Sequence, residues 1–116
     1  MATELPTAGY DDLRAHILST WGYVELQDDT GAQVTRVEIA TDSRASWSQS
    51  GDVRTVTFTV SGSDADVTTP VTVTSSHLFN SDTGGDSLSN DSFSGANIEE
   101  DGDELTVEHE VQVPQV

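Results

Sequence analysis

The sequence predicts a mainly β fold, a single antiparallel β-sandwich with one short N-terminal α-helix. Alternation of apolar and polar residues in several runs is the first observation, because side chains on a strand alternate between two faces. Composition is the second, since Val and Thr are plentiful while Lys is absent. Clusters of Gly, Asp and Ser between the runs supply turns at regular spacing. The 116 residues suit one domain, with a helix over residues 7–20 and the sandwich over residues 21–113.

Residues 7–20 carry the helical pattern. Bulky apolar residues recur here at intervals of three or four positions: Tyr10, Leu13, Ile17 and Trp21. This spacing places them on one stripe of a helix. We interpret the stripe as a face that packs on the strands, because its residue types fit a core better than a ligand site.

Short alternating runs follow the helix. Residues 21–27 and 33–39 flank the turn-like sequence Asp28–Gly31, so we expect them to form a hairpin. Further strands are expected over residues 41–48, 53–61 and 71–79.

The segment from residue 80 to residue 98 is rich in Ser, Asp, Asn and Gly, and we expect it to be largely loop. A turn is expected over Ser81–Asp86, with positive φ angles at the glycines. The bulky apolar residues of this segment are few and widely spaced: Leu88, Phe93 and Ile98.

The last run, residues 104–113, alternates without interruption. One face carries Leu105, Val107, His109, Val111 and Val113, and the other carries Thr106, Glu108, Glu110 and Gln112. We therefore expect a long strand with one packed face and one face in water.

Charge is the strongest compositional signal. The chain has 21 acidic residues against 4 basic ones, a formal net charge of −17, and residues 55–116 contain neither arginine nor lysine. Such a surface repels nucleic-acid phosphates and anionic membranes, so we expect neither as a partner. At molar salt the Debye length is only about 3 Å, which suppresses the self-repulsion. We therefore predict a protein of a salt-loving organism or of a virus that infects one; the alternative is a merely acidic surface module.

The sequence contains no cysteine and no long apolar segment. Cysteine is absent, which excludes disulfides and thiolate metal ligands. We expect no signal peptide, because the first six residues have neither a basic nor an apolar stretch. No apolar run approaches the ~20 residues that cross a bilayer.

The histidines and serines do not form a recognisable catalytic set. His16, His77 and His109 share no metal-ligand spacing, and no G-x-S-x-G sequence marks a nucleophilic serine. We expect His109, on the apolar face of the last run, to be a hydrogen-bonded or interface histidine. The protein is therefore predicted not to be an enzyme.

Two weaker sets of candidate residues remain. Asp82 and Asp86 could supply carboxylates to a calcium ion, although close pairs of Asp are also expected by chance in so acidic a chain. Arg14, Arg36 and Arg54 are candidates for contacts with another subunit or a partner, because each would meet an acidic neighbour. Internal salt bridges are an equal alternative for these arginines. No other cofactor is expected.

Several short motifs follow one another in order along the chain. They are Gly9–Leu18, Val56–Val60, His77–Asn80, Gly84–Gly85, the pair Leu88 and Phe93, and Gly102–Val107. In this order they resemble a family of small virion proteins encoded among the tail genes of tailed viruses. Members carry, in turn, G-x-x-x-L-R-x-x-L, a V-T-F run, G-L-F-N, a Gly-Gly turn, L-x-x-x-x-F and D-D-E-L-T-V. The resemblance covers residues 9–113, but Asp28–Gly31 is shorter than the glycine-rich segment that family members have there.

The resemblance implies a structural component at the tail, baseplate or fibre attachment, with no catalytic residues to carry over. We therefore expect a virion protein that assembles as a symmetric homo-oligomer beside other virion proteins. One alternative is a capsid-surface decoration or turret subunit. Another is a module that binds glycans on the host surface, which would need an exposed aromatic patch or a metal in a loop.

Overall fold

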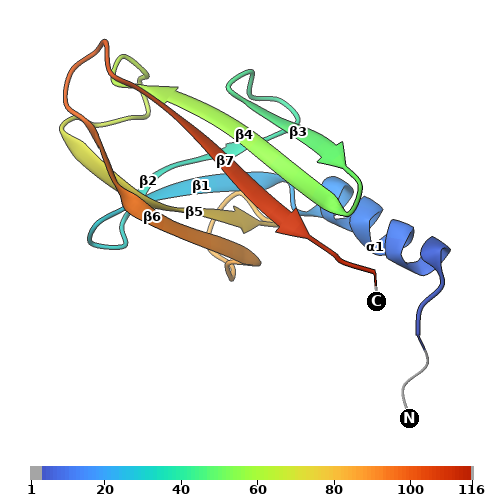
Figure 1. Cartoon of the computed structure of the whole chain (residues 1–116). Helices are drawn as coiled ribbons and strands as arrows, with labels where there is room; N and C mark the ends of the chain where they lie inside the picture. Colours follow the sequence, from blue (N-terminus) through green and yellow to red (C-terminus); the bar gives the residue numbers. More distant parts are fainter. Residues whose placement is uncertain (1–3, 116) are drawn as a thin grey trace.

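The computed structural model describes residues 4–115 and confirms the predicted fold class, with one helix and two antiparallel sheets (Figure 1). Its elements are α1 (Thr7–Thr20), β1 (Tyr23–Asp28), β2 (Gln33–Glu38), β3 (Ala45–Ser50), β4 (Val53–Ser61), β5 (Val71–Phe79), β6 (Ser89–Ile98) and β7 (Glu104–Gln112). The molecule measures 53 × 27 × 24 Å along its principal axes.

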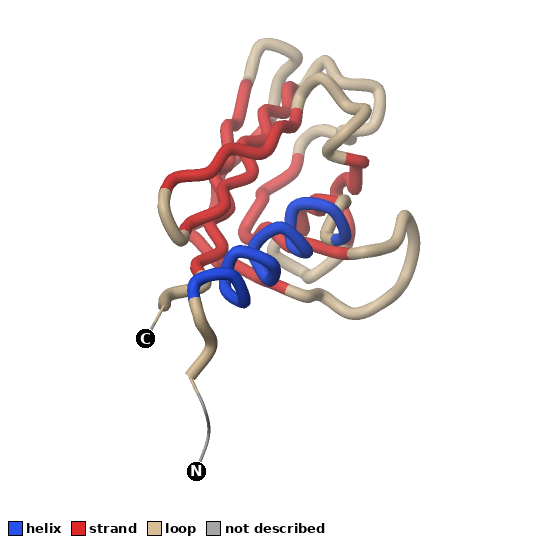
Figure 2. The backbone as a smooth tube through the Cα atoms, turned by 90° about the vertical axis from the view of Figure 1, so that its right-hand side faces the viewer, coloured by secondary structure: helices blue, strands red, loops and turns tan. Residues whose placement is uncertain are grey.

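The chain contributes strands to the two sheets alternately. One sheet has the strand order β2-β1-β5-β6, and the other has the order β3-β4-β7. Successive hairpins therefore alternate between the sheets, and β7 returns to pair with β4 over nine residues. Helix α1 lies across one end of the strands (Figure 2). The outermost strands of each sheet, β2 and β6 in one and β3 and β7 in the other, pair with a neighbour on one side only. Each of these four strands therefore has a free edge.

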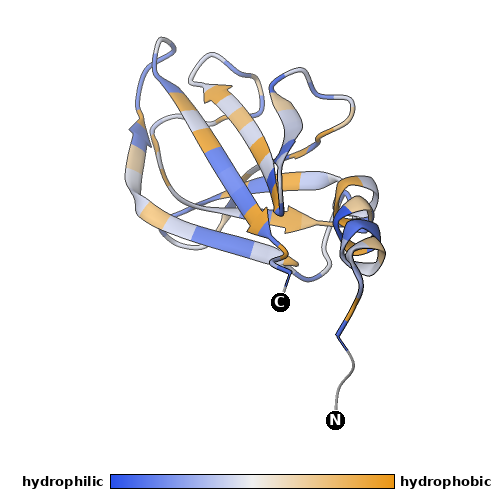
Figure 3. Cartoon of the chain, turned by 45° about the vertical axis from the view of Figure 1, so that its right-hand side comes forward, coloured by the Kyte–Doolittle hydropathy of each residue, from blue (hydrophilic) through white to orange (hydrophobic). Residues whose placement is uncertain are grey.

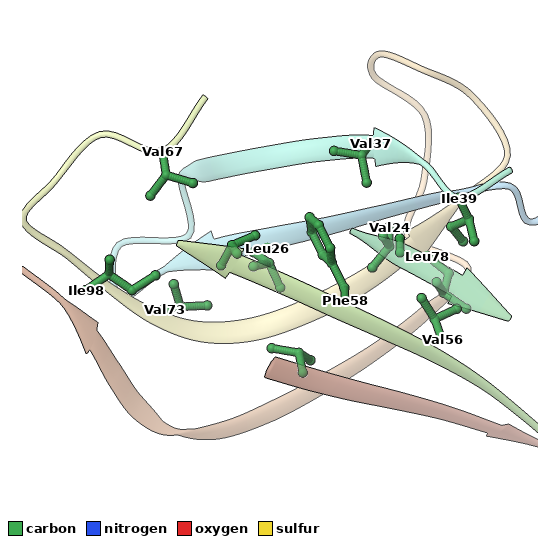
Figure 4. Close-up of a cluster of buried hydrophobic side chains, with 13 residues drawn as sticks. Val24, Leu26, Val37, Ile39, Val56, Phe58, Val67, Val73, Leu78 and Ile98 are labelled. Atoms are coloured by element: carbon green, nitrogen blue, oxygen red, sulfur yellow. The ribbon is translucent and has the colours of Figure 1, made fainter. Parts of the chain in front are cut away.

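The core lies between the sheets, where the inward residues of both meet (Figure 4). Strand β4 shows the pattern most clearly, because Val56, Phe58 and Val60 are fully buried while the threonines between them are half-buried. Across from β4, Val24 and Leu26 of β1 are also fully buried. The alternation in the sequence therefore predicted the inward faces of these strands correctly.

The two faces of β7 are as predicted. Val107 and His109 are buried and Val111 is half-buried, whereas Glu108 and Glu110 are exposed. Figure 3 shows the same alternation of apolar and polar bands along the strands.

The helix has the predicted bounds, but one residue of its buried stripe was predicted wrongly. Tyr10 and Ile17 are buried, whereas Leu13 is 45% exposed and Arg14 lies on the buried face instead. Arg14 is held there because its Nε and Nη2 atoms donate to the carbonyl of Val113, at 3.1 and 2.5 Å. This contact ties the helix to the segment that follows β7.

Two strand predictions need correction. The stretch over residues 80–98 is not largely loop, because Ser89–Ile98 forms β6 and pairs with β5. Backbone pairing to a well-formed neighbour outweighs the low strand propensity of Ser, Asn, Asp and Gly. Strand β3 begins at Ala45, since residues 41–44 form a turn. The turn after β5 has the expected positive φ angles, 60° at Gly84 and 77° at Gly85.

Candidate functional site

The three arginines suggested for partner contacts are occupied within the chain. Arg14 binds Val113, as described, and its side chain is 7% exposed. Arg54 is buried at the start of β4, and its Nη1 donates to the carbonyls of Gly51 and Val53 at 2.9 and 3.2 Å. Arg36 pairs with Glu25 and is 5% exposed. Arg14 and Arg36 thus make internal ion pairs, as in the alternative, whereas Arg54 binds backbone carbonyls instead. Contacts of these arginines with a partner stay a prediction.

A buried ion pair lies on the outer face of the four-stranded sheet. Glu25 of β1 stands directly opposite Arg36 of β2, and Arg36 Nε lies 2.9 Å from Glu25 Oε1. The two side chains are 4% and 5% exposed. The guanidinium stacks 3.6 Å from the ring centre of Phe79, which is itself buried. The alternation in the sequence predicts that this face is exposed to solvent. It therefore gave no indication that Glu25 is buried.

The loop after β5 covers this ion pair. Arg36 Nη1 donates to the carbonyl of Ser81 at 3.0 Å and to that of Gly84 at 2.9 Å. The positive φ angles at Gly84 and Gly85 let the loop fold back over the sheet. The β1–β2 hairpin register was the one signal in the sequence that could have placed Glu25 beside Arg36.

The same contacts bear on the calcium hypothesis for Asp82 and Asp86. Both residues are exposed, and the inward carbonyls of their loop already accept hydrogen bonds from Arg36. A cation that used those carbonyls would lie beside a guanidinium. Over residues 4–115, no three His, Asp or Glu side chains form a group that could hold a metal ion. The calcium site stays a prediction.

The fourth arginine, Arg44, is clamped by three aspartates. Its guanidinium lies 2.8 Å from Asp42, 2.9 Å from Asp64 and 2.8 Å from Asp66. Hydrogen bonds from Arg44 are the main cause that lowers the pKa of Asp66 to about 2, and Thr35 donates a further bond of 2.6 Å to that carboxylate. This cluster joins the β2 strand to the turn before β3 and to the β4–β5 loop.

His109 is a buried hydrogen-bonded residue, which was the interpretation that the sequence favoured. Its Nδ1 lies 2.7 Å from Ser76 Oγ, and its Nε2 lies 2.8 Å from Ser89 Oγ. Because His109 belongs to β7 and both serines belong to the other sheet, the imidazole joins the two layers. Burial lowers the pKa of His109 below its usual value, so the neutral ring is favoured.

His77 forms a second serine–histidine group on the outer face. Its Nε2 lies 2.9 Å from Ser75 Oγ and its Nδ1 lies 3.0 Å from Ser87 Oγ. Both ring nitrogens therefore meet hydroxyls, and the nearby Glu25 carboxylate binds Arg36 and Gln27 instead. A nucleophilic serine needs an imidazole oriented by a third group such as a carboxylate. The arrangement fits a structural role for His77, which anchors the loop after β5.

The four arginines are bound within the chain while most carboxylates face solvent, and we call this arrangement the segregation of charge. The guanidinium groups of all four arginines make contacts inside the chain. Of the acidic residues over positions 4–115, Glu25 alone is buried. The exposed large apolar residues of that range are Leu5, Leu13 and Leu88, which are aliphatic and cannot form an aromatic platform for a glycan.

These features define a small antiparallel β-sandwich whose arginines are all bound within the chain, with an anionic surface and open strand edges. No helix of the described residues is long and apolar enough to cross a membrane. Comparisons with known protein families, curated proteins and solved structures find no match to this chain.

Proposed function

We propose that this chain is a non-enzymatic structural protein of the virion of a tailed virus with a halophilic host. Its expected place is the tail, the baseplate or the fibre attachment. The chain acts there as a rigid module that assembles with copies of itself and with other virion proteins. Support for the virion role comes from the order of motifs over residues 9–113, which resembles tail-gene virion proteins.

The segregation of charge is the observation that carries the salt-adapted part of the proposal. A chain with a net charge of −17, whose four guanidinium groups are all bound internally, repels copies of itself in dilute buffer. At molar salt that repulsion falls off within about 3 Å, so association becomes feasible. Assembly in concentrated salt is therefore the setting that fits this surface.

The internal networks support a scaffolding role over a catalytic one. Both imidazoles of the sandwich are held by serine hydroxyls, and the Glu25 carboxylate is held by Arg36. Each network joins one strand or layer to another. Open edges on both sheets provide surfaces through which neighbouring subunits could pair.

Labelling of intact particles tests the proposal. Antibodies against the purified chain are applied to purified particles of a virus that encodes it, and the particles are imaged by electron microscopy. Label at the tail tip or baseplate is the expected result. Label over the capsid would instead support a decoration or turret subunit. Absence of the chain from purified particles would overturn both assignments.

A further inference from the structure

We propose that β3 forms a dimer interface, in which two copies of this chain pair antiparallel through their β3 edges. The pairing would join the two three-stranded sheets into one continuous sheet. This inference rests on the assembly role proposed for the chain, and it names both the surface and the partner, which is a second copy.

The free edge of β3 follows from its pairing with β4. The amide of Thr59 donates to the carbonyl of Arg44, so this residue pair is a hydrogen-bonded one. Because hydrogen-bonded pairs alternate along antiparallel strands, Ser46 and Ser48 also bond to β4. The backbone groups of Trp47 and Gln49 then point away from β4. Within residues 4–115, no strand lies on that side in the sheet order.

Strand β3 lacks the features by which proteins protect an edge. Its sequence, Ala-Ser-Trp-Ser-Gln-Ser, contains no charged residue and no proline, and its register with β4 is continuous over all six residues. Charges, prolines and bulges are the usual means of preventing edge-to-edge pairing. The other edge strands carry exposed charges: Glu38 on β2, Asp91 on β6, and Glu104, Glu108 and Glu110 on β7.

The charge of the molecule selects a second copy at this edge. Two chains of net charge −17 can approach most closely where neither presents a carboxylate. The exposed side chains of β3 are Ser46, Ser48, Gln49 and Ser50, all neutral. An antiparallel pair of identical edges is also self-complementary, as a two-fold dimer requires. A basic partner would have its best match at the acidic β7 edge instead.

The alternation of hydrogen bonds restricts the register, and we place the two-fold axis beside Ser48, midway between the outward-facing Trp47 and Gln49. A two-fold axis beside Ser48 would set Trp47 opposite Gln49 of the second copy, with their outward backbone groups bonded to each other. The two copies of Ser48 would then face each other in a non-hydrogen-bonded pair, with Cα atoms about 4.5 Å apart. That separation lies within the range that a disulfide bridges.

Backbone blocking provides the first test. Gln49→Pro removes an amide N–H that β4 does not use and places the proline ring on the free edge. Gln49→Ala is the matched control, because it keeps the N–H. In about 2 M KCl, where charges are screened, sedimentation equilibrium should show dimers for the parent chain and for Gln49→Ala. Gln49→Pro should be monomeric with an unchanged circular dichroism spectrum.

A second variant covers the case in which the proline disturbs folding. Ser48→Glu would set two like charges opposite each other at the dimer axis while its side chain stays exposed in the monomer. It should weaken dimerisation at least tenfold at about 0.3 M KCl, with partial recovery in about 2 M KCl. A monomeric parent chain in concentrated salt, or a folded Gln49→Pro variant that still dimerises, would overturn the interface.

Cross-linking tests the register separately. The chain has no cysteine, so Ser48→Cys offers one thiol, and mild oxidation should yield a covalent dimer. Ser92→Cys, exposed on β6, is the matched control and should yield no covalent dimer. If Gln49→Pro abolishes the dimer but Ser48→Cys does not cross-link, the register alone would be overturned. A β3 dimer in solution combined with absence from particles would refute the virion role and leave the interface standing.

Discussion

Glu25 and Arg36 occupy a face of the sheet that a half-exposed strand would normally give to water. The pair is buried because the loop after β5 folds over it and supplies two carbonyl acceptors to Arg36. Desolvation of two charges is costly, and it is offset only when the geometry is good and the remaining polar atoms are bonded. Here the ion pair, the Phe79 ring and the loop meet these conditions together.

We predict that Glu25→Gln destabilises the fold by about 3–5 kcal/mol, the usual cost of leaving one buried charge without its partner. Urea unfolding in about 2 M KCl measures the change. The double variant Glu25→Leu/Arg36→Met should lose less than the single one, because it removes both charges at once. The single variants Glu25→Leu and Arg36→Met complete the comparison. If the double variant loses as much stability as these two added together, the pair is not coupled.

His109 should make stability depend on pH near neutrality. Burial lowers its pKa in the folded state, while the unfolded chain titrates near the usual value of 6.5. The unfolded state therefore binds more protons below that pH. Stability is complete above about pH 7 and falls as the pH drops through 6.5 towards the folded-state pKa. His77 shifts in the same direction and adds to the effect.

The variant His109→Gln tests this expectation, because its amide can still bond a serine but does not titrate. Free energies of unfolding at about pH 7.5 and pH 5 should differ less in the variant than in the parent chain. Salt is held at about 2 M so that acid does not act through general charge repulsion. Equal pH dependence in both proteins would remove His109 as the cause.

At the scale of elements, β7 joins the core to the acidic surface. Val107→Asp would bury a carboxylate among apolar neighbours and should cost about 3 kcal/mol or more. Glu108→Gln, its neighbour on the exposed face, should change the free energy of unfolding by less than about 0.5 kcal/mol in concentrated salt. Thermal and urea unfolding of both variants would reveal the contrast. Similar stabilities would contradict the assignment of the two faces.

Elements with strong periodicity were predictable from the sequence, and elements held by neighbours were not. Strands β4 and β7 alternate cleanly, so their inward residues could be read directly. Strand β6 has a weak pattern, mostly exposed, and exists because β5 supplies its hydrogen bonds. In the helix, Arg14 displaces Leu13 from the buried face through a bond to Val113, a residue 99 positions away. No local pattern contains that contact.

The candidate residues also divide into contacts that the sequence could predict and contacts that it could not. His109 could be predicted as a hydrogen-bonded residue, because a polar residue on an apolar face needs partners. Its partners Ser76 and Ser89 could not be predicted, because they come from the opposite sheet. The sequence also left open whether the arginines face a neighbour or the interior. The internal partners of Arg36 and Arg44 lie in distant loops, at Ser81 and Asp64, so no local pattern could predict them.

At the scale of the whole molecule, we predict that stability rises with salt. The chain has 21 acidic residues against four arginines, and the arginines are all bound within the chain. Raising KCl from about 0.1 M to about 3 M shortens the screening length well below the spacing of these carboxylates, so the unfolding temperature should increase. Circular dichroism melting curves across this range provide the measurement. An unchanged melting temperature would contradict the prediction.

A charge-reduced variant separates screening from the general effect of salt on apolar burial. Glu104, Glu108 and Glu110 lie on the exposed face of β7, two to four residues apart. Replacing all three by Gln should raise the melting temperature at low salt and make the salt dependence shallower. An equal salt dependence in the two proteins would point to the apolar core instead.

The internal contacts of the four arginines also affect where proteases can cut the chain. Trypsin cuts only after arginine or lysine, and this chain offers it four arginines and no lysine. Each of those side chains is held by contacts of the folded state, whereas carboxylates such as Glu99 and Glu100 stand exposed in a loop. The folded chain should therefore resist trypsin but admit a glutamate-specific protease. Tryptic cleavage would then report the population of opened molecules.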